Sequence, residues 1–527
     1  MHLPALSLES WAATRGPDQA GRPLALLHEH QVLHVDALAQ ARGVRTGLKR
    51  ATALALAPDL LLGLADGRRD AQALRAVVDV ALGFSPSVTW LPPGAPAASP
   101  ALVGVRLEVQ SCLRYFGGLP ALLARLRDAL APLGHRVQIA SAATALGAAL
   151  LAGWRNDLAL GPHSSGPDAR AALQTLLDSA PLALLASGGV HAAALQGMGL
   201  HTLADLRQLP RDGLARRFGP ELLADIDRAR GQLPEAHAWL TLPPRFTSRL
   251  ELMCRADTSA QLLVGARVLL ARLVAWAGAR QARIARFTLV MHHEPRRQRE
   301  RLSGDAPPTH TSLLIAPAEP AADAEHLYSL LVERLGRLPL AEPALELSLR
   351  CEHLVAGTPP NGELFASPAS QREGLARLVE RLQARLGADR VQRFGPVADH
   401  RPECATRWQT VDPARLSTLG TPGTGPATSG PADTAEQARA LATQPLWLLS
   451  PPRPLAEQQQ RPLLAGQPLQ LLAGPDRLET GWWDDTGPAV RDYFIAQAAS
   501  GALVWVYRHR LPADGAGPGW FLQGLFG

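Results

Sequence analysis

Three carboxylates in or beside strand-like segments near the N-terminus, Glu9, Asp36 and Glu108, are candidate metal ligands, and His2 adds an imidazole. Nucleotide addition to a nucleic acid uses two metal ions held by carboxylates, which activate the attacking hydroxyl and neutralise the triphosphate. Magnesium prefers oxygen ligands, so His2 suits such a site poorly. A metal site built from these residues is therefore the less favoured interpretation.

A tight turn at Gly197-Met198-Gly199-Leu200 joins two predicted short helices and is typical of a helix-hairpin-helix motif. Such turns direct backbone N–H groups at a DNA phosphate, whatever the base sequence. Arg216 and Arg217 follow it. The alternative is a turn with a structural role only.

Residues 243–317 hold twelve arginines against five acidic residues. Seven of these arginines stand at or near the start of a predicted strand or in the loop after it: Arg280, Arg283, Arg286, Arg296, Arg297, Arg299 and Arg301. Contact with a nucleic-acid backbone is one use of such a cluster, and a solvated loop is the other.

Composition sets broad limits. The chain of 527 residues is too long for one core, has a net charge of +6 and a pI near 9.6, and is 46% hydrophobic. Its four cysteines are scattered without a CxxC pair, which argues against a zinc site or a disulfide framework. No signal-peptide pattern or uncharged apolar span is found. We expect a cytoplasmic protein that needs no cofactor.

The elements that must position these residues change along the chain. Strands and helices alternate over the first 165 residues, short helices fill 181–233, and two strand–helix–strand halves span 243–352. A helix at Gln371–Leu386, a Pro/Gly/Ser/Thr-rich linker at 417–434 and an aromatic-rich β module at 445–527 follow. Those aromatics are interpreted as core rather than as a base-stacking platform. The pattern predicts an α+β multidomain fold.

The segment from Ala101 to Gly118 resembles the second palm motif of Y-family translesion DNA polymerases, through Leu107-Glu108-Val109 and Tyr115-Phe116-Gly117. This resemblance implies a palm and fingers at 1–165, with the fingers at about 12–77, and a helix-hairpin-helix thumb at 166–240. It also implies a little-finger-like α/β domain at 241–355. A clamp-motif region, helix and linker at 356–444 and a β-rich partner-binding module at 445–527 complete the expected order.

The same resemblance implies that the catalytic carboxylates are lost. His2 stands at the first metal Asp of the family, and Val103 and Gly104 stand at its Asp-Glu pair. Residues that contact the triphosphate in the family are replaced as well, at Ala37, Gln40, Ala145 and Ala149. The implied protein keeps a polymerase scaffold without a metal site.

Catalytic carboxylates and triphosphate contacts are thus lost in several motifs while the scaffold is kept. This pattern resembles the ImuB proteins of the bacterial damage-induced mutagenesis cassette, as do the segments Arg216–Leu222, Ser450–Leu455 and Arg477–Asp484. The resemblance implies a non-catalytic adaptor in translesion synthesis, DNA repair and the SOS response. It would bind DNA and join the sliding clamp to an error-prone DnaE-type polymerase and an ImuA/RecA-like protein.

The clamp contact implied by the resemblance is a short peptide whose apolar pair fills a pocket. The best match follows Pro360 and comprises Asn361, Glu363, Leu364 and Phe365 in the run Asn-Gly-Glu-Leu-Phe. Leu525-Phe526 is a competing pair. Two other interpretations stay open: an active Y-family polymerase with altered metal ligands, and a DNA-binding protein without a clamp or polymerase partner.

Overall fold

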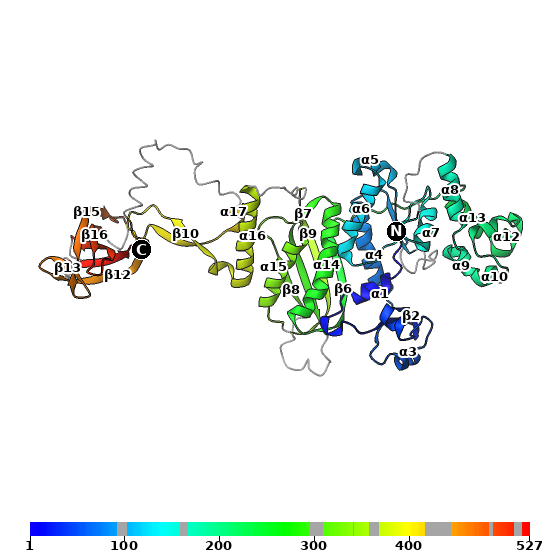
Figure 1. Cartoon of the computed structure of the whole chain (residues 1–527), viewed down its shortest axis with the longest axis horizontal. Coiled ribbons are helices and arrows are strands. Elements are labelled where there is room, and N and C mark those ends of the chain that lie inside the picture. Colours follow the sequence, from blue (N-terminus) through cyan, green and yellow to red (C-terminus); the bar gives the residue numbers. More distant parts are fainter. Residues whose placement is uncertain are drawn as a thin grey trace. The chain divides into compact units, whose positions relative to one another are not determined.

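The computed structural model describes residues 1–91, 103–158, 167–294, 309–340, 342–357, 368–416, 444–483, 488–510 and 519–526. The chain divides into two compact units, Met1–Ala366 and Ser367–Gly527 (Figure 1). Both mix helices with sheets, so the predicted α+β multidomain class is confirmed. The predicted linker at 417–434 lies outside the described residues.

An N-terminal body forms around helix α4 and a small sheet. Its elements are α1 (Leu6–Ala12), α4 (Gly67–Leu82), β4 (Val88–Leu91), β5 (Gly104–Leu107), α5 (Leu113–Phe116), α6 (Leu119–Leu130) and α7 (Ala145–Trp154). Leu74 and Val77 of α4 pack with Leu122 and Leu126 of α6 and with Val105 of β5. The helical spacing of leucines around 122–130 is thus explained by one buried face.

A three-stranded lobe is inserted between α1 and α4. It contains β1 (Leu24–His28), β2 (Gln31–Val35), α2 (Ala37–Ala41), α3 (Arg50–Leu56) and β3 (Leu61–Leu64), in the sheet order β2-β1-β3. Gly43 and Gly47, both with positive φ, lie between the two helices and explain why the alanine-rich run 37–56 is not one helix.

A helical lobe follows the body. Its helices are α8 (Pro167–Asp178), α9 (Ala186–Val190), α10 (Ala192–Gly197), α11 (Leu203–Arg207), α12 (Arg211–Phe218) and α13 (Pro220–Arg230). Thr202 caps α11 in a capping box with Asp205. Leu195, Leu206, Leu214 and Leu222 meet in the core of this lobe.

A four-stranded lobe closes the first unit. It contains β6 (Phe246–Ala256), α14 (Ser259–Ala279), β7 (Ala282–His293), β8 (His310–Ile315), α15 (Ala324–Arg337) and β9 (Ala344–Ala356). The antiparallel sheet has the order β6-β9-β7-β8, and Figure 1 shows α14 beside it. A Cβ on Gly265 would meet Leu252 and Leu347, so α14 lies very close to the sheet.

Helix α14 is the one helix within the described ranges that is long and apolar enough to cross a membrane by length and composition, with a hydropathy of 1.7. Half of that apolar stretch is buried in this structure. Trp276 and Leu269 of α14 are buried, and Trp276 stacks near Phe246 of the sheet. Its apolar character is that of a core helix.

The second unit begins with α16 (Pro368–Leu386), the hairpin β10 (Gln392–Pro396) and β11 (Thr406–Thr410), and α17 (Pro413–Leu416). A seven-stranded antiparallel sheet of order β14-β13-β12-β18-β17-β16-β15 follows. Its strands are β12 (Trp447–Gln458), β13 (Arg461–Leu464), β14 (Gln467–Pro468), β15 (Gln470–Thr480), β16 (Ala489–Gln497), β17 (Leu503–His509) and β18 (Trp520–Leu525).

Candidate functional site

The three positions expected to have lost metal ligands lie together in the N-terminal body. The backbone of His2 bridges to both Gly104 and Gln138. The protonated Nδ1 of His2 donates to the carbonyl oxygen of Val103 at 3.0 Å. His2 is 7% exposed, and burial lowers the pKa of its imidazole, so the neutral ring is favoured at physiological pH.

Gly104 leaves no space for a side chain. A Cβ placed there would fall far inside van der Waals contact with the carbonyl oxygen of Met1. Arg106 lies two residues along β5, so its side chain leaves the strand on the same face as position 104. Burial lowers the pKa of Arg106, while Glu235 acts in the opposite direction. A cationic side chain on this face opposes the binding of a divalent cation.

Each of the three candidate carboxylates accepts a hydrogen bond from a different backbone N–H group. Glu9 accepts the N–H of Arg136 at 3.0 Å, and Asp36 caps α2 by accepting from Ala39 at 2.7 Å. Glu108 accepts the N–H of Gln110 at 2.6 Å. Among the residues that the structure describes, no group of three His, Cys, Asp or Glu side chains is placed to hold a metal ion.

The start of α7, where the family motif has two lysines, is closed by an acidic residue instead. Thr144 caps the helix by accepting from Gly147 at 3.1 Å, and both Glu235 oxygens accept from Leu146 at 3.1 Å. Glu235 was missed in the sequence because it lies 89 residues beyond Leu146 in a connecting segment. Its position at a helix N-terminus is electrostatically favourable.

The predicted turn between two short helices is present, with Gly197 ending α10 and Gly199 at φ +77°. Its amides, however, donate within the chain: Met198 and Leu200 to Leu195 O, and Gly199 to Gln196 O. The next two backbone N–H groups, those of His201 and Thr202, donate to the Asp205 carboxylate at 2.9 and 2.8 Å. These hydrogen bonds lower the pKa of Asp205, which stays ionised.

Arg216 and Arg217 are both exposed in the last turn of α12. Arg217 lies over the ring of Phe218, with 5.6 Å between its Cζ and the ring centroid. Arg211, on the same helix, forms an ion pair with Asp227 at 2.6 Å. Side chains rather than turn amides are therefore the phosphate donors available on this lobe.

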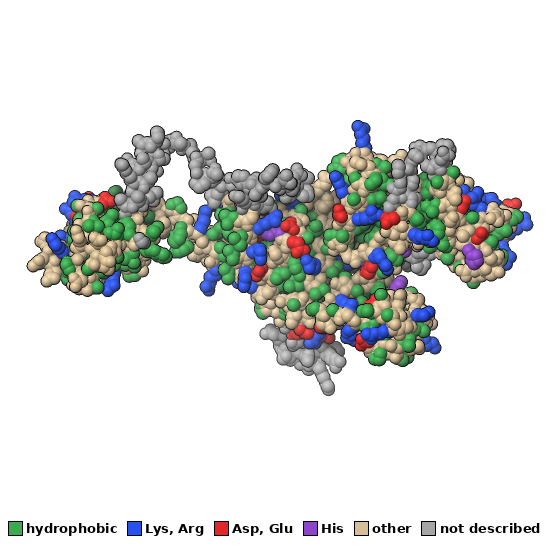
Figure 2. Space-filling view, viewed as in Figure 1, with side chains coloured by type: hydrophobic (Ala, Val, Ile, Leu, Met, Phe, Trp, Pro, Cys, Tyr) green, Lys and Arg blue, Asp and Glu red, His purple; other side chains and the backbone are tan. Residues whose placement is uncertain are grey.

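The predicted arginines of the four-stranded lobe have different surroundings. Arg280 lies over Trp276 and donates to the Pro243 carbonyl at 2.6 Å, which fixes the connecting segment before β6. Arg286 is exposed and contacts His353 at 2.7 Å, whereas Arg283 is partly buried. The remaining four lie outside the described residues: Arg296, Arg297, Arg299 and Arg301. Figure 2 shows basic side chains interspersed with acidic ones on the face in view.

The predicted clamp peptide also lies outside the described residues, which exclude 358–367. The competing pair Leu525-Phe526 lies at the end of β18, where Leu525 is 38% exposed. Phe526 packs with the aromatic cluster of the C-terminal sheet.

The aromatics of the C-terminal sheet are mostly core, in agreement with the sequence interpretation. Tyr493, Trp505, Tyr507 and Trp520 are 2–8% exposed. Tyr493 stacks on Trp505 with 4.3 Å between ring centroids. Burial raises the pKa of Tyr493 strongly, so its hydroxyl stays protonated.

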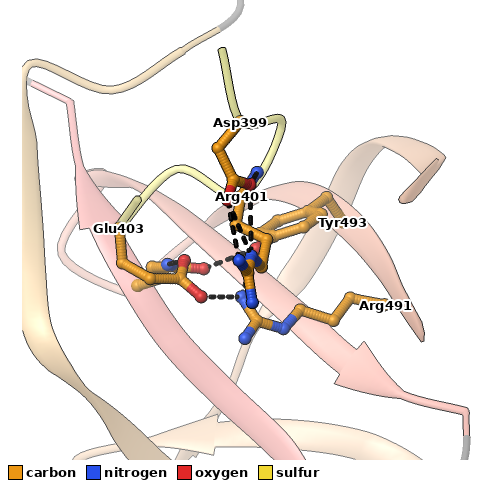
Figure 3. Close-up of polar contacts among 6 residues, drawn as sticks. Asp399, Arg401, Glu403, Arg491 and Tyr493 are labelled. Carbon is orange, nitrogen blue, oxygen red and sulfur yellow. Dashed lines mark hydrogen bonds and ion pairs between the residues drawn. The ribbon is translucent and has the colours of Figure 1, made fainter. Parts of the chain in front are cut away.

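A polar network joins the loop between β10 and β11 to this sheet (Figure 3). Glu403 pairs with Arg491 at 2.8 Å and accepts from the Gln523 amide at 2.7 Å, and the Tyr493 hydroxyl donates to Gln523 at 2.6 Å. The network spans 120 residues of sequence, so no local pattern predicted it.

Comparison with known proteins gives one decisive relationship. Protein ImuB from two strains of Caulobacter vibrioides is 30% identical to this chain over 499 residues, which cover 92% of this chain and 100% of the relative. The chain belongs to the ImuB family. The family predicted from the motifs is thereby confirmed.

Other comparisons add less. No protein-family model matches the chain. Solved structures that resemble it include the Dbh ternary complex, at 14% identity and a TM-score of 0.35 over 66% of this chain and 96% of that one. DinB from Sulfolobus solfataricus is also 14% identical, with a TM-score of 0.34 over 67% and 97%. The family assignment rests on the ImuB relatives.

Proposed function

We propose that this chain is a non-catalytic, Y-family polymerase-like adaptor for error-prone synthesis past DNA damage. The observation that carries the proposal is the arrangement of His2, Val103 and Gly104. They meet in one place, as the metal ligands of a polymerase must, but supply no carboxylate, and Arg106 lies on the same face. Two-metal catalysis needs several carboxylates at that point.

In this proposal each lobe of the first unit corresponds to a domain of a Y-family polymerase. The N-terminal body is the palm, the three-stranded lobe the fingers, the helical lobe the thumb and the four-stranded lobe the little finger. DNA is held without regard to sequence by exposed arginines, of which Arg216, Arg217 and Arg286 are described. Such contacts to phosphate give a strongly salt-dependent affinity. The protein acts in the cytoplasm as part of the SOS response.

The partners in the proposal follow from family membership and the clamp-like peptide. Leu364 and Phe365 enter the apolar pocket of the sliding clamp, and the C-terminal unit recruits a DnaE-type polymerase and an ImuA/RecA-like protein. An active polymerase with rearranged ligands is disfavoured because Glu9, Asp36 and Glu108 each accept a hydrogen bond from a different backbone N–H group.

Recovery of purified sliding clamp by the tagged full chain tests the adaptor role. The native chain and Leu525→Ala/Phe526→Ala should both retain the clamp, and Leu364→Ala/Phe365→Ala should lose it. If Leu364→Ala/Phe365→Ala still retains the clamp, the clamp contact lies elsewhere in the chain. A native chain that binds DNA but no clamp would leave only the alternative of a DNA-binding protein without this partner.

A further inference from the structure

The hairpin β10–β11 carries two large aromatic rings on its surface. Phe394 and Trp408 are directly opposite each other in the antiparallel register, with ring centroids 3.9 Å apart. They are 62% and 58% exposed, in contrast to the buried rings of the C-terminal sheet. Two exposed rings in contact form a broad apolar surface whose burial by a ligand is favourable.

The hairpin is held at both ends, which makes this surface a fixed one. At its base, the Gln383 amide of α16 donates to Val411 O at 2.6 Å. At its tip, Glu403 pairs with Arg491 and accepts from Gln523, as Figure 3 shows for the labelled residues. An isolated two-stranded hairpin is only marginally stable in water, so these contacts hold the surface formed by Phe394 and Trp408 in place.

Asp399 and Glu403, the two acidic residues in the loop between the strands, are both engaged with arginine. Asp399 pairs with Arg401 at 2.7 Å, and both side chains are about as buried as the core. Glu403 is held by Arg491. The loop therefore presents little free negative charge toward an anionic ligand.

The two strands themselves carry two charged residues, Arg393 and Arg407, and both are exposed. They lie on the face opposite the rings, since Arg393 pairs with Gln409 and Arg407 with Gly395. Neighbouring strands are only about 4.8 Å apart, so a guanidinium on a long side chain can reach a phosphate backbone along either edge. Stacking rings on one face, with guanidinium groups that reach around the edges from the other face, match a chain of bases and phosphates.

We propose that the Phe394–Trp408 surface binds single-stranded DNA, with unpaired bases stacked on the rings and the backbone held by Arg393 and Arg407. This site is separate from the duplex contacts assigned to the first unit. It goes beyond the adaptor role and does not depend on the clamp peptide. Base stacking on aromatic side chains tolerates any base sequence, which suits a DNA strand of arbitrary sequence.

The test is the affinity of the full chain for a fluorescein-labelled oligothymidylate, measured by anisotropy beside a labelled duplex with the same number of phosphates. Phe394→Ala and Trp408→Ala should each weaken the single-strand Kd roughly tenfold, since one stacked base is lost, and Trp408→Phe should retain most of the affinity. Arg393→Gln should lower the salt dependence by about 0.7 in the logarithmic slope. Trp447→Ala, which removes a tryptophan that is 70% exposed on β12, is the matched control and should leave the Kd unchanged.

Unchanged single-strand binding by the Phe394→Ala/Trp408→Ala double variant, with a native circular dichroism spectrum, would overturn the proposal. Loss of a co-purifying protein partner in that variant with single-strand affinity intact would overturn it too, because the rings would then be a protein contact. The affinity for duplex DNA distinguishes a failure of this proposal from a failure of the proposed function. It should be preserved in the double variant and should fall only when arginines of the first unit are changed.

Discussion

The Nδ1 of His2 lies 3.0 Å from the carbonyl oxygen of Val103, which joins two chain segments that are 101 residues apart. A histidine here uses its protonated nitrogen to hold the neighbouring strand. The adjoining Gly104 allows the Met1 carbonyl to take the space of a side chain. The positions expected to hold metal ligands have thus become packing contacts between strands.

A side chain at position 104 is predicted to destabilise the first unit. Gly104→Ala should lower the free energy of unfolding by about 1–3 kcal/mol because the N-terminal segment at Met1 must move. Gly213→Ala is the control, since a Cβ at that helical position meets nothing within 4 Å and alanine favours a helix. Chemical unfolding followed by circular dichroism measures both. Equal stability of Gly104→Ala and the native chain would contradict the close packing at this strand.

Asp79 is predicted to make stability depend on pH. It accepts from Arg75 at 3.0 Å, but burial outweighs this contact and raises its pKa from 3.8 to about 6. The folded state keeps a proton that the unfolded state releases, so stability from this group falls as pH rises through about 4 to 6. Asp79→Asn removes this dependence.

Urea unfolding at about pH 5 and pH 7.5 tests this prediction. Between about pH 5 and pH 7.5, the free energy of unfolding of Asp79→Asn should rise relative to that of the native chain by on the order of 1 kcal/mol. Asp128→Asn, at an exposed position on α6, is the control. A variant that is equally weakened at both pH values would show that the ion pair with Arg75 outweighs the burial of Asp79.

Exposed arginines on α12 are predicted to bind duplex DNA through phosphate. Arg216→Gln and Arg217→Gln should each weaken affinity for any sequence and reduce the salt slope by about 1. Arg211→Gln should have little effect, because that guanidinium is already paired with Asp227. Anisotropy titrations at several salt concentrations provide the slopes. An unchanged slope in the Arg216→Gln/Arg217→Gln variant would remove α12 from the DNA interface.

Local patterns predicted much of the fold. The four-stranded lobe agrees with the expectation of two strand–helix–strand halves, because its apolar periods and breaks are strong; the halves are β6-α14-β7 and β8-α15-β9. Thr202 and Asp205 form the capping box of α11 and stand three residues apart. Such features depend on neighbours within a few residues.

Features that depend on distant contacts were not predictable from one sequence. The hairpin β10–β11 has no strong alternation and is anchored through Glu403 to residues about 90 to 120 positions away. Arg280 was expected to contact DNA, yet Trp276 and the Pro243 carbonyl give it a structural partner. The turn at Gly199 was predicted, but its internal hydrogen bonds depend on the packed geometry of Leu195 and Asp205.

Primer extension by the purified full chain on primed DNA, in magnesium and in manganese, tests the central claim most directly. DNA binding is measured on the same preparation, so that an inactive protein is distinguished from an unfolded one. We expect DNA binding without nucleotide incorporation under either metal. Incorporation that persists through stringent purification would contradict it, and would mean that other carboxylates hold catalytic metal ions.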